Sequence, residues 1–168
     1  MDAFPGYLQI PSLASPPPEA LADPAEATEV TCAANDEMAE IVAKYPDRFV
    51  SFVAALPMND SDASVREAER AVTTLGAAGV QVFSNVNGRA LDQSEFRPVF
   101  REAHRLGCTV WIHPARGMDK PDYDGEDYSK YELWWTLAWP YETSVAMYRL
   151  VFSFSFNAGG VLLTYTSS

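Results

Sequence analysis

Short apolar runs alternate with amphipathic stretches through the middle of the chain. The first of these runs, Phe49–Ala55, is continuously apolar, which is typical of a parallel strand covered on both faces. The stretches between the runs place apolar residues at helical spacing and end at Gly76 and Gly107, as helices commonly do. The pattern predicts three parallel strands, adjacent in chain order, with their connecting helices outside: Phe49–Ala55, Ala63–Leu75, Gly79–Phe83, Pro98–Leu106 and Cys108–Ile112.

The flanking segments predict two more helices and a weaker strand. Asp23-Pro24 is typical of a helix start, and the helical pattern that follows ends at Lys44. A further amphipathic helix is expected over Tyr141–Val151, and Tyr7–Ala14 could form a strand that carries a proline. Between them, Ala115–Pro140 is expected to be a long loop, rich in acidic and aromatic residues. Such a loop either shapes a substrate pocket or docks its aromatic side chains on the helices.

Repeated strand–helix units with right-handed crossovers produce either an open doubly wound sheet or part of a barrel. The chain has 168 residues, which is short for a complete eightfold barrel of ~250 residues. We therefore expect an α/β fold of parallel strands and outer helices. Residues 1–153 are expected to form this domain, and residues 154–168 form a divergent tail without charged residues.

Composition narrows the classes of function and location. The formal net charge is −11, so a phosphate backbone would be repelled and nucleic acid is not an expected partner. The two cysteines, Cys32 and Cys108, form no CxxC motif and suit a reducing compartment. No signal peptide and no apolar stretch of ~18 residues is present, so we expect a cytoplasmic protein without a membrane span.

The strongest candidate for chemistry is His113, which ends the third apolar run. Ligands of parallel α/β folds bind outside the carboxyl ends of the strands. Asn85 follows the preceding strand and is therefore expected on the same rim as His113. The second histidine, His104, lies on the polar face of a helix with Arg101 and Arg105 and is expected to be a solvated surface residue.

Several passages resemble the metal-dependent amidohydrolase-related decarboxylases, the family of aminocarboxymuconate-semialdehyde decarboxylase and γ-resorcylate decarboxylase. The resemblance covers roughly residues 5–153 and rests on the order and spacing of the passages together. They are Asn35-Asp36, Tyr45–Phe49, Ala55–Pro57, Gly79–Asp92, Phe96–Phe100, Val110–Pro114, Trp139–Thr143, Arg149-Leu150 and Ser153.

This resemblance implies a partial (β/α)8 TIM barrel of about four to five βα units, apparently from a truncated member. It also implies a divalent metal, usually zinc, at the carboxyl face of the barrel. The family's ligands are an HxH pair on the first strand, a histidine in mid-chain and a late aspartate, and a second histidine assists the chemistry. Only the mid-chain histidine has a counterpart, His113. Asn85 or Asp60 could add an oxygen ligand.

Three interpretations follow from these observations. The first is a nonoxidative decarboxylase, or a related hydrolase, acting on a small aromatic or enoic carboxylate that enters near Asn85, His113 and Trp139. The second is a non-catalytic fragment or interaction module, whose exposed strand edges could support a homodimer. The third is a doubly wound small-molecule-binding domain, although neither of the usual nucleotide motifs is present.

Overall fold

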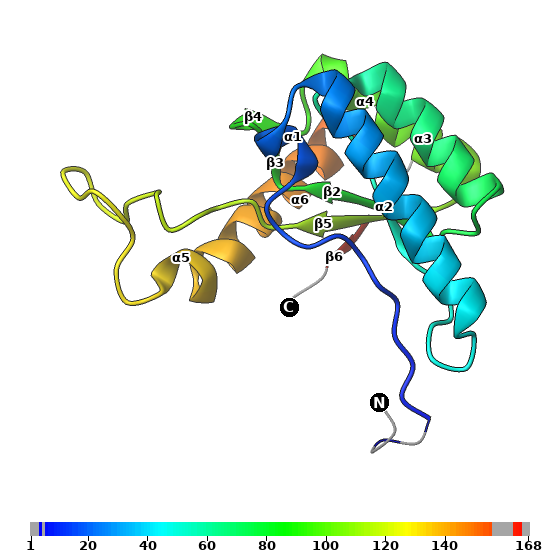
Figure 1. Cartoon of the computed structure of the whole chain (residues 1–168). Helices are drawn as coiled ribbons and strands as arrows, with labels where there is room; N and C mark the ends of the chain where they lie inside the picture. Colours follow the sequence, from blue (N-terminus) through cyan, green and yellow to red (C-terminus); the bar gives the residue numbers. More distant parts are fainter. Residues whose placement is uncertain (1–3, 5, 156–162, 166–168) are drawn as a thin grey trace.

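A parallel sheet forms the centre of the molecule (Figure 1). The computed structural model describes residues 4, 6–155 and 163–165. Its main sheet has the order β1 (Val53–Ala55), β2 (Gly79–Phe83), β5 (Thr109–His113) and β6 (Leu163–Tyr165). All three pairings are parallel. The predicted order and direction of the first three strands are therefore confirmed, and this part of the chain forms an open sheet without barrel closure.

Helices on one face of the sheet create the apolar core. This layer contains α3 (Ser61–Thr73), α4 (Arg97–Leu106) and α6 (Ala138–Ser155). Their apolar side chains meet alternate residues of the strands, because successive side chains of a strand point to opposite faces. The core-facing strand residues are Ala54, Val80, Val82, Val110 and Ile112. The remaining alternate positions, Gln81, Phe83, Trp111 and His113, therefore belong to the other face.

Local sequence signals explain where several helices begin and end. Asp23 accepts hydrogen bonds from the amides of residues 25 and 26, which fixes the start of α2 (Pro24–Lys44) as predicted. Asp60 caps α3 in the same way, through the amide of Ala63 at 2.9 Å. Gly107 ends α4 with a φ of 63°, which confirms the predicted left-handed cap. However, α4 begins at Arg97 rather than Pro98, because the short helix η1 (Ser94–Phe96) leads directly into it.

The N-terminal segment covers the outer edge of β1 without forming a strand of its own. Over the predicted strand Tyr7–Ala14 the structure has only an isolated parallel bridge between Gln9 and Phe49. A proline at position 11 supplies its carbonyl to the amide of Val53 at 2.9 Å but has no N–H to continue the ladder. One helical turn, α1 (Pro18–Leu21), follows this segment.

The long loop and the tail contain more structure than the sequence predicted. Residues 115–140 include α5 (Leu133–Thr136) and the first turn of α6. The hairpin β3 (Asn85–Val86) and β4 (Arg89–Ala90) occupies the loop after β2. No strand was expected beyond residue 153, yet Leu163–Tyr165 pairs with β5 as β6.

Among the described helices, none is both long and apolar enough to cross a membrane.

Candidate functional site

The carboxyl ends of β2 and β5 form one rim of the sheet. Phe83 and His113 are register partners at the ends of their strands. The amide of Ser84 donates to the carbonyl of His113 at 2.8 Å, which extends the pairing towards Asn85. Asn85 and His113 therefore share the rim, as predicted, while His104 is exposed on α4.

The imidazole of His113 is half-buried between two aromatic rings. Its centroid lies 5.1 Å from that of Phe83 and 5.7 Å from that of Trp139. Its Nδ1 lies 2.7 Å from the carbonyl oxygen of Pro114. Because a carbonyl only accepts, this contact requires the proton on Nδ1 and leaves the lone pair on Nε2. His113 is thus held in the tautomer in which Nε2 can accept a proton or bind a metal ion.

A carboxylate that sequence reasoning missed organises the rim. Glu142 on α6 accepts hydrogen bonds from Asn85 Nδ2 at 2.8 Å, from the amide of Arg116 at 2.8 Å and from that of Ala115 at 3.3 Å. It thereby joins α6 to the segments that follow β2 and β5. A sequence signal existed, since Glu142 lies in the Trp139–Thr143 passage and is one of two charged residues on α6.

Asn85 is positioned through both ends of its side-chain amide. Its Nδ2 donates to Glu142, while its Oδ1 accepts from the amide of Gly88 at 2.8 Å. This second bond closes the turn of the hairpin, where Asn87 and Gly88 both have positive φ values. The side chain of Asn85 is therefore oriented by the protein before any ligand binds.

Trp139 connects the long loop to the rim. Its indole N–H donates to the carbonyl of Arg116 at 2.8 Å. Its ring also lies edge-on to Trp134, with centroids 5.4 Å apart, and packs against Trp135 at 6.1 Å. Three tryptophans thus form one aromatic cluster next to His113, which supports the expectation that this loop shapes a pocket.

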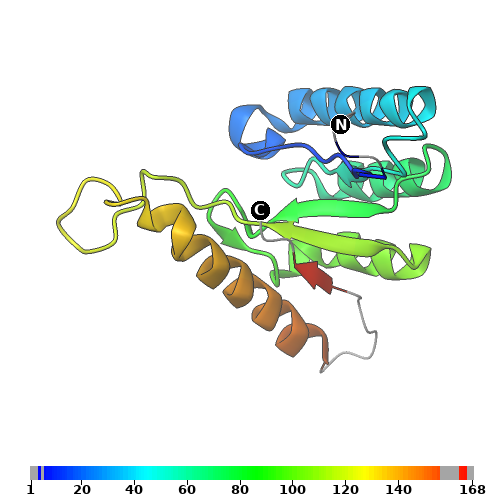
Figure 2. The same ribbon diagram turned by 90° about the horizontal axis from the view of Figure 1, so that it is seen from below.

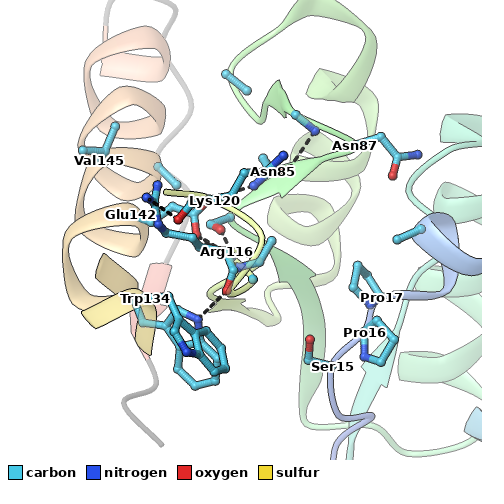
Figure 3. Close-up of a pocket in the computed structure, with 18 of the residues that line it drawn as sticks. Ser15, Pro16, Pro17, Asn85, Asn87, Arg116, Lys120, Trp134, Glu142 and Val145 are labelled. Atoms are coloured by element: carbon cyan, nitrogen blue, oxygen red, sulfur yellow. Dashed lines mark hydrogen bonds between the residues drawn. The ribbon is translucent and has the colours of Figure 1, made fainter. Parts of the chain in front are cut away.

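A pocket of ≈ 1070 Å³ opens beside these residues. Figure 3 shows Glu142, Trp134 and Arg116 on one side and Pro16 and Pro17 on the other. Asn85 and Trp139, both predicted to bind substrate, line it. His113 is absent from its described lining, although its ring packs against that of Trp139. The lining residues used below are Asn85, Arg116, Lys120, Trp134, Trp139 and Glu142.

The cationic side chains of the pocket favour an anionic ligand. Arg149 is held by Asp92 through three hydrogen bonds to its carboxylate, at 2.9, 3.0 and 3.1 Å. Arg116 uses one terminal nitrogen to bind the carbonyls of Lys120 and Pro121. The Lys120 ammonium is mostly exposed and lies 3.4 Å from Asp119. Glu142 and Asp119 line the same pocket, so its three cationic side chains outnumber its carboxylates by one.

The described residues do not by themselves provide a complete metal site. A catalytic zinc site usually needs three protein ligands and an open position. No group of three or more histidine, cysteine, aspartate or glutamate residues is arranged to hold a metal ion in the described part of the chain. The two oxygen donors considered above are already engaged, since Asn85 holds the hairpin and Asp60 caps α3. His113 is the remaining candidate ligand.

Two further carboxyl groups lie away from the rim. Glu67 is buried and accepts from Arg70, Asn35 and the thiol of Cys32. Burial alone would raise the pKa of Glu67, but these hydrogen bonds outweigh it and hold the pKa below its usual value. Glu19 on α1 is also buried, and neither of its oxygens has a partner among the described residues. Burial raises the pKa of Glu19 to about 7.

The sequence matches a known family over most of its length. Residues 11–154 fit the profile of the family described as Amidohydrolase. The γ-resorcylate decarboxylase of Rhizobium radiobacter is 36% identical over 166 residues, covering 94% of this chain and 50% of the relative. The 2-amino-3-carboxymuconate-6-semialdehyde decarboxylase of Dictyostelium discoideum is 34% identical over 131 residues, covering 78% of this chain and 35% of the relative.

A solved structure shows the same arrangement. The crystal structure of a dihydroxybenzoic acid decarboxylase from Polaromonas sp. JS666 contains bound manganese and an inhibitor, 2-nitroresorcinol. It is 32% identical and superposes with a TM-score of 0.79 over 98% of this chain and 51% of that one. The chain therefore spans about half the length of this protein and half or less of the curated relatives.

Proposed function

The chain belongs to the amidohydrolase family, and we propose that it contributes a metal-ligating histidine and a substrate pocket to a nonoxidative decarboxylase of small aromatic carboxylates. The expected reaction breaks the bond between the ring and the carboxylate carbon and releases carbon dioxide. In this interpretation the four parallel strands are an arc of a (β/α)8 barrel. The relatives support this function over an unrelated binding module, because both curated proteins described above are decarboxylases.

One observation carries the proposal. The carboxyl ends of β2 and β5 bring His113 and Asn85 to one rim, and Trp139 packs on His113 from the other end of the loop. Metal-binding and substrate-binding groups of barrel enzymes gather at this face. The adjoining pocket offers aromatic surface from Trp134 and Trp139 for a ring and cations for a carboxylate.

We infer that His113 contributes Nε2 to a divalent metal ion. Hydrogen bonding of Nδ1 to a backbone carbonyl is the usual way in which a metal-binding histidine is oriented, and His113 makes that contact with Pro114. Manganese in the Polaromonas enzyme supports a divalent ion, and zinc stays a prediction from the resemblance. Such an ion would act as a Lewis acid. One histidine does not complete this site.

The roles of the other side chains are to bind and orient. We propose that Asn85 presents its amide to the substrate while Glu142 holds that amide in place. Trp139 would form an apolar wall that separates the substrate ring from solvent. Lys120 and Arg116 would attract the substrate carboxylate towards the pocket.

The test compares the two histidines of the chain. We expect the purified protein to bind Mn²⁺ weakly in a titration followed by electron paramagnetic resonance. His113→Ala should weaken that binding at least tenfold, because it removes the ligand. His104→Ala should leave it unchanged, because that imidazole lies exposed on α4. Carbon dioxide release from γ-resorcylate with added Mn²⁺ or Zn²⁺ should be negligible with this chain alone.

Two results would overturn parts of the proposal. Equal Mn²⁺ affinity in the two histidine variants would remove His113 as a ligand. Metal retained near one ion per chain after dialysis, with turnover abolished by His113→Ala, would show a complete site built from residues not identified above. Calorimetric titration with γ-resorcylate tests the pocket separately, and Trp139→Ala should weaken that binding.

A further inference from the structure

One wall of the pocket comes from the N-terminal part of the chain. We call residues 13–22 the wall segment, which contains α1 and the prolines that precede it. Figure 3 shows Pro16 and Pro17 on the opposite side of the pocket from Trp134. In Figure 2, α1 (dark blue) lies at the end of the sheet to which the strand arrows point, which is the rim described above. The wall segment therefore bounds the pocket on the side away from the aromatic cluster.

Side-chain amides hold the wall segment on the rim by its backbone carbonyls. Asn87, in the hairpin after β2, donates to the carbonyl of Glu19 at 2.9 Å. Asn59, in the loop after β1, donates to that of Ala22 at 3.2 Å. Gln81 holds the beginning of the segment in the same way, at 2.7 Å. Of these three amides, Asn87 is the one whose residue also lines the pocket.

The wall segment presents an uncharged and stiff surface to the pocket. Its one charged residue, Glu19, is 3% exposed and is absent from the described lining. Proline rings fix φ and leave no backbone N–H, so Pro16 and Pro17 offer apolar surface without donors. The cationic side chains of Arg116 and Lys120 lie on the opposite side (Figure 3). A carboxylate would therefore bind away from α1, and the ring edge opposite the carboxylate would face the wall segment.

We propose that Asn87 is a positioning residue that holds α1 in place, and that α1 thereby determines how large a ring the pocket accepts. The inference rests on the proposed function, since it takes the ligand to be a small aromatic carboxylate. With α1 fixed, the distance between the prolines and the cations limits the size of the ring. Without the Asn87 bond, α1 stays anchored through Ala22 but not through Glu19, so the wall recedes and the limit is relaxed.

The backbone of Asn87 permits a substitution that removes only the donor. Its φ is 50°, in the left-handed region that glycine adopts readily, so Asn87→Gly keeps the turn of the hairpin. Asn87→Asp keeps the size of the side chain, and aspartate also tolerates this region, but an ionised carboxylate cannot donate. Arg89→Ala is the matched control, since Arg89 lies in the same hairpin but pairs with Glu95 and does not line the pocket.

Hydrogen exchange tests the anchor without any ligand. The amides of Ala20 and Ala22 make the backbone bonds that define the turn of α1, at 3.0 and 3.2 Å. Both amides should exchange about fivefold faster in Asn87→Gly and Asn87→Asp, because one net hydrogen bond that keeps the turn closed is worth about that factor. Exchange within α2 should not change, and Arg89→Ala should exchange like the wild type.

Calorimetric titration with two ligands tests the selectivity. One ligand is γ-resorcylate, and the other is the dihydroxynaphthoate that keeps its carboxylate and both flanking hydroxyl groups and adds a fused ring at the opposite edge. Both Asn87 variants should shift the ratio of the two affinities about fivefold in favour of the larger ligand. A general loss of stability would weaken both ligands alike and leave this ratio unchanged. The ratio would also stay unchanged if Asn87 acted by bonding directly to a group that both ligands share.

Unchanged exchange at Ala20 and Ala22 in both Asn87 variants would overturn the role of Asn87 as an anchor. Faster exchange with an unchanged affinity ratio would show that α1 does not limit the size of the ring and would overturn the selectivity. Binding of neither ligand by the wild type would overturn the proposed function together with the selectivity. In that case the exchange measurement would still decide whether Asn87 holds α1.

Discussion

Glu67 on α3 and Glu142 on α6 both hold neighbouring segments in place, but with different partners. Glu67 lies behind β1 and receives Arg70, Asn35 and Cys32, so a full positive charge balances it inside the fold. Glu142 lies at the rim and receives only an asparagine amide and two backbone N–H groups. A carboxylate that is buried with its counter-ion, as Glu67 is, is suited to stabilising the fold. A carboxylate that neutral groups hold beside a pocket, as Glu142 is, is suited to positioning the side chains of that pocket.

Their neighbours strengthen the contrast. Asn35 donates to Glu67 and also pairs with both the amide and the carbonyl of Ala55, so it completes the outer edge of β1. That network has no contact with the pocket. Asn85, by contrast, is held by Glu142 and lines the pocket. The same pair of residue types therefore stabilises a strand edge in one place and orients a candidate binding group in the other.

Glu67→Ala should produce the largest loss of stability. It would remove the buried acceptor that Arg70 and Asn35 share, although Arg70 keeps its bond to Asp36. Breaking a buried pair costs about 3–5 kcal/mol. We expect the lower end of that range, because Arg70 is partly exposed. Urea unfolding followed by circular dichroism measures the effect. Glu69→Ala is the control, because Glu69 lies on the same helix as Glu67 but makes an exposed ion pair, with Arg105.

The network also predicts how Glu67 responds to acid. Its folded pKa lies below the usual value of 4.5, so its contribution to stability is present above pH 4.5 and is lost as pH falls through the folded pKa. In Glu67→Gln the free energy of unfolding should vary less between pH 5 and 3 than in the wild type. An identical acid dependence in the two proteins would contradict the role assigned to this network.

Glu19 should show the opposite pH dependence, because it has no donors. Its folded pKa of about 7 exceeds the ordinary 4.5, so the folded state retains a proton that the unfolded state releases. Stability should therefore fall as pH rises from 4.5 to 7 and stay level above that, by about 3 kcal/mol at 1.36 kcal/mol per pKa unit. Glu19→Gln should remove this decline in unfolding experiments at pH 5, 6, 7 and 8. A wild type with constant stability over that interval would show that Glu19 is solvated.

Glu142→Gln should reduce stability by only about 1–2 kcal/mol, the range for charge-assisted hydrogen bonds. The glutamine NH₂ would face either the Asn85 amide or the backbone N–H groups, so one set of bonds would be lost. Hydrogen exchange should accelerate at residues 84–88 and 115–117 while β1 stays protected. If exchange accelerated equally throughout the sheet, Glu142 would be part of the general core rather than a positioning residue.

The sequence could predict the central strands and the position of His113 because both depend on local patterns. Apolar runs and helix signals at Asp23 and Gly107 act over a few residues, and the parallel order then places His113 and Asn85 on one rim. The Glu142 cluster could not be predicted in this way, since its contact with Asn85 joins residues 57 positions apart. Pairing of β6 with β5 was missed for the same reason, because a short apolar tail carries no signal for its partner strand.

The smallest effect is expected from Trp139→Phe, which separates the aromatic wall of the pocket from its hydrogen bond. Phenylalanine keeps a ring beside His113 but cannot donate to the carbonyl of Arg116, so stability should fall by about 1 kcal/mol, the net value of one hydrogen bond. Trp135→Phe is the matched control, since Trp135 belongs to the same aromatic cluster but does not line the pocket. If Trp139 orients the loop after β5, only Trp139→Phe should accelerate hydrogen exchange at residues 115–117 and weaken γ-resorcylate binding. Equal effects of the two substitutions on exchange and binding would mean that the tryptophan cluster acts through its bulk alone. The hydrogen bond of Trp139 would then not orient the loop, and Glu142 would be the residue that positions the rim.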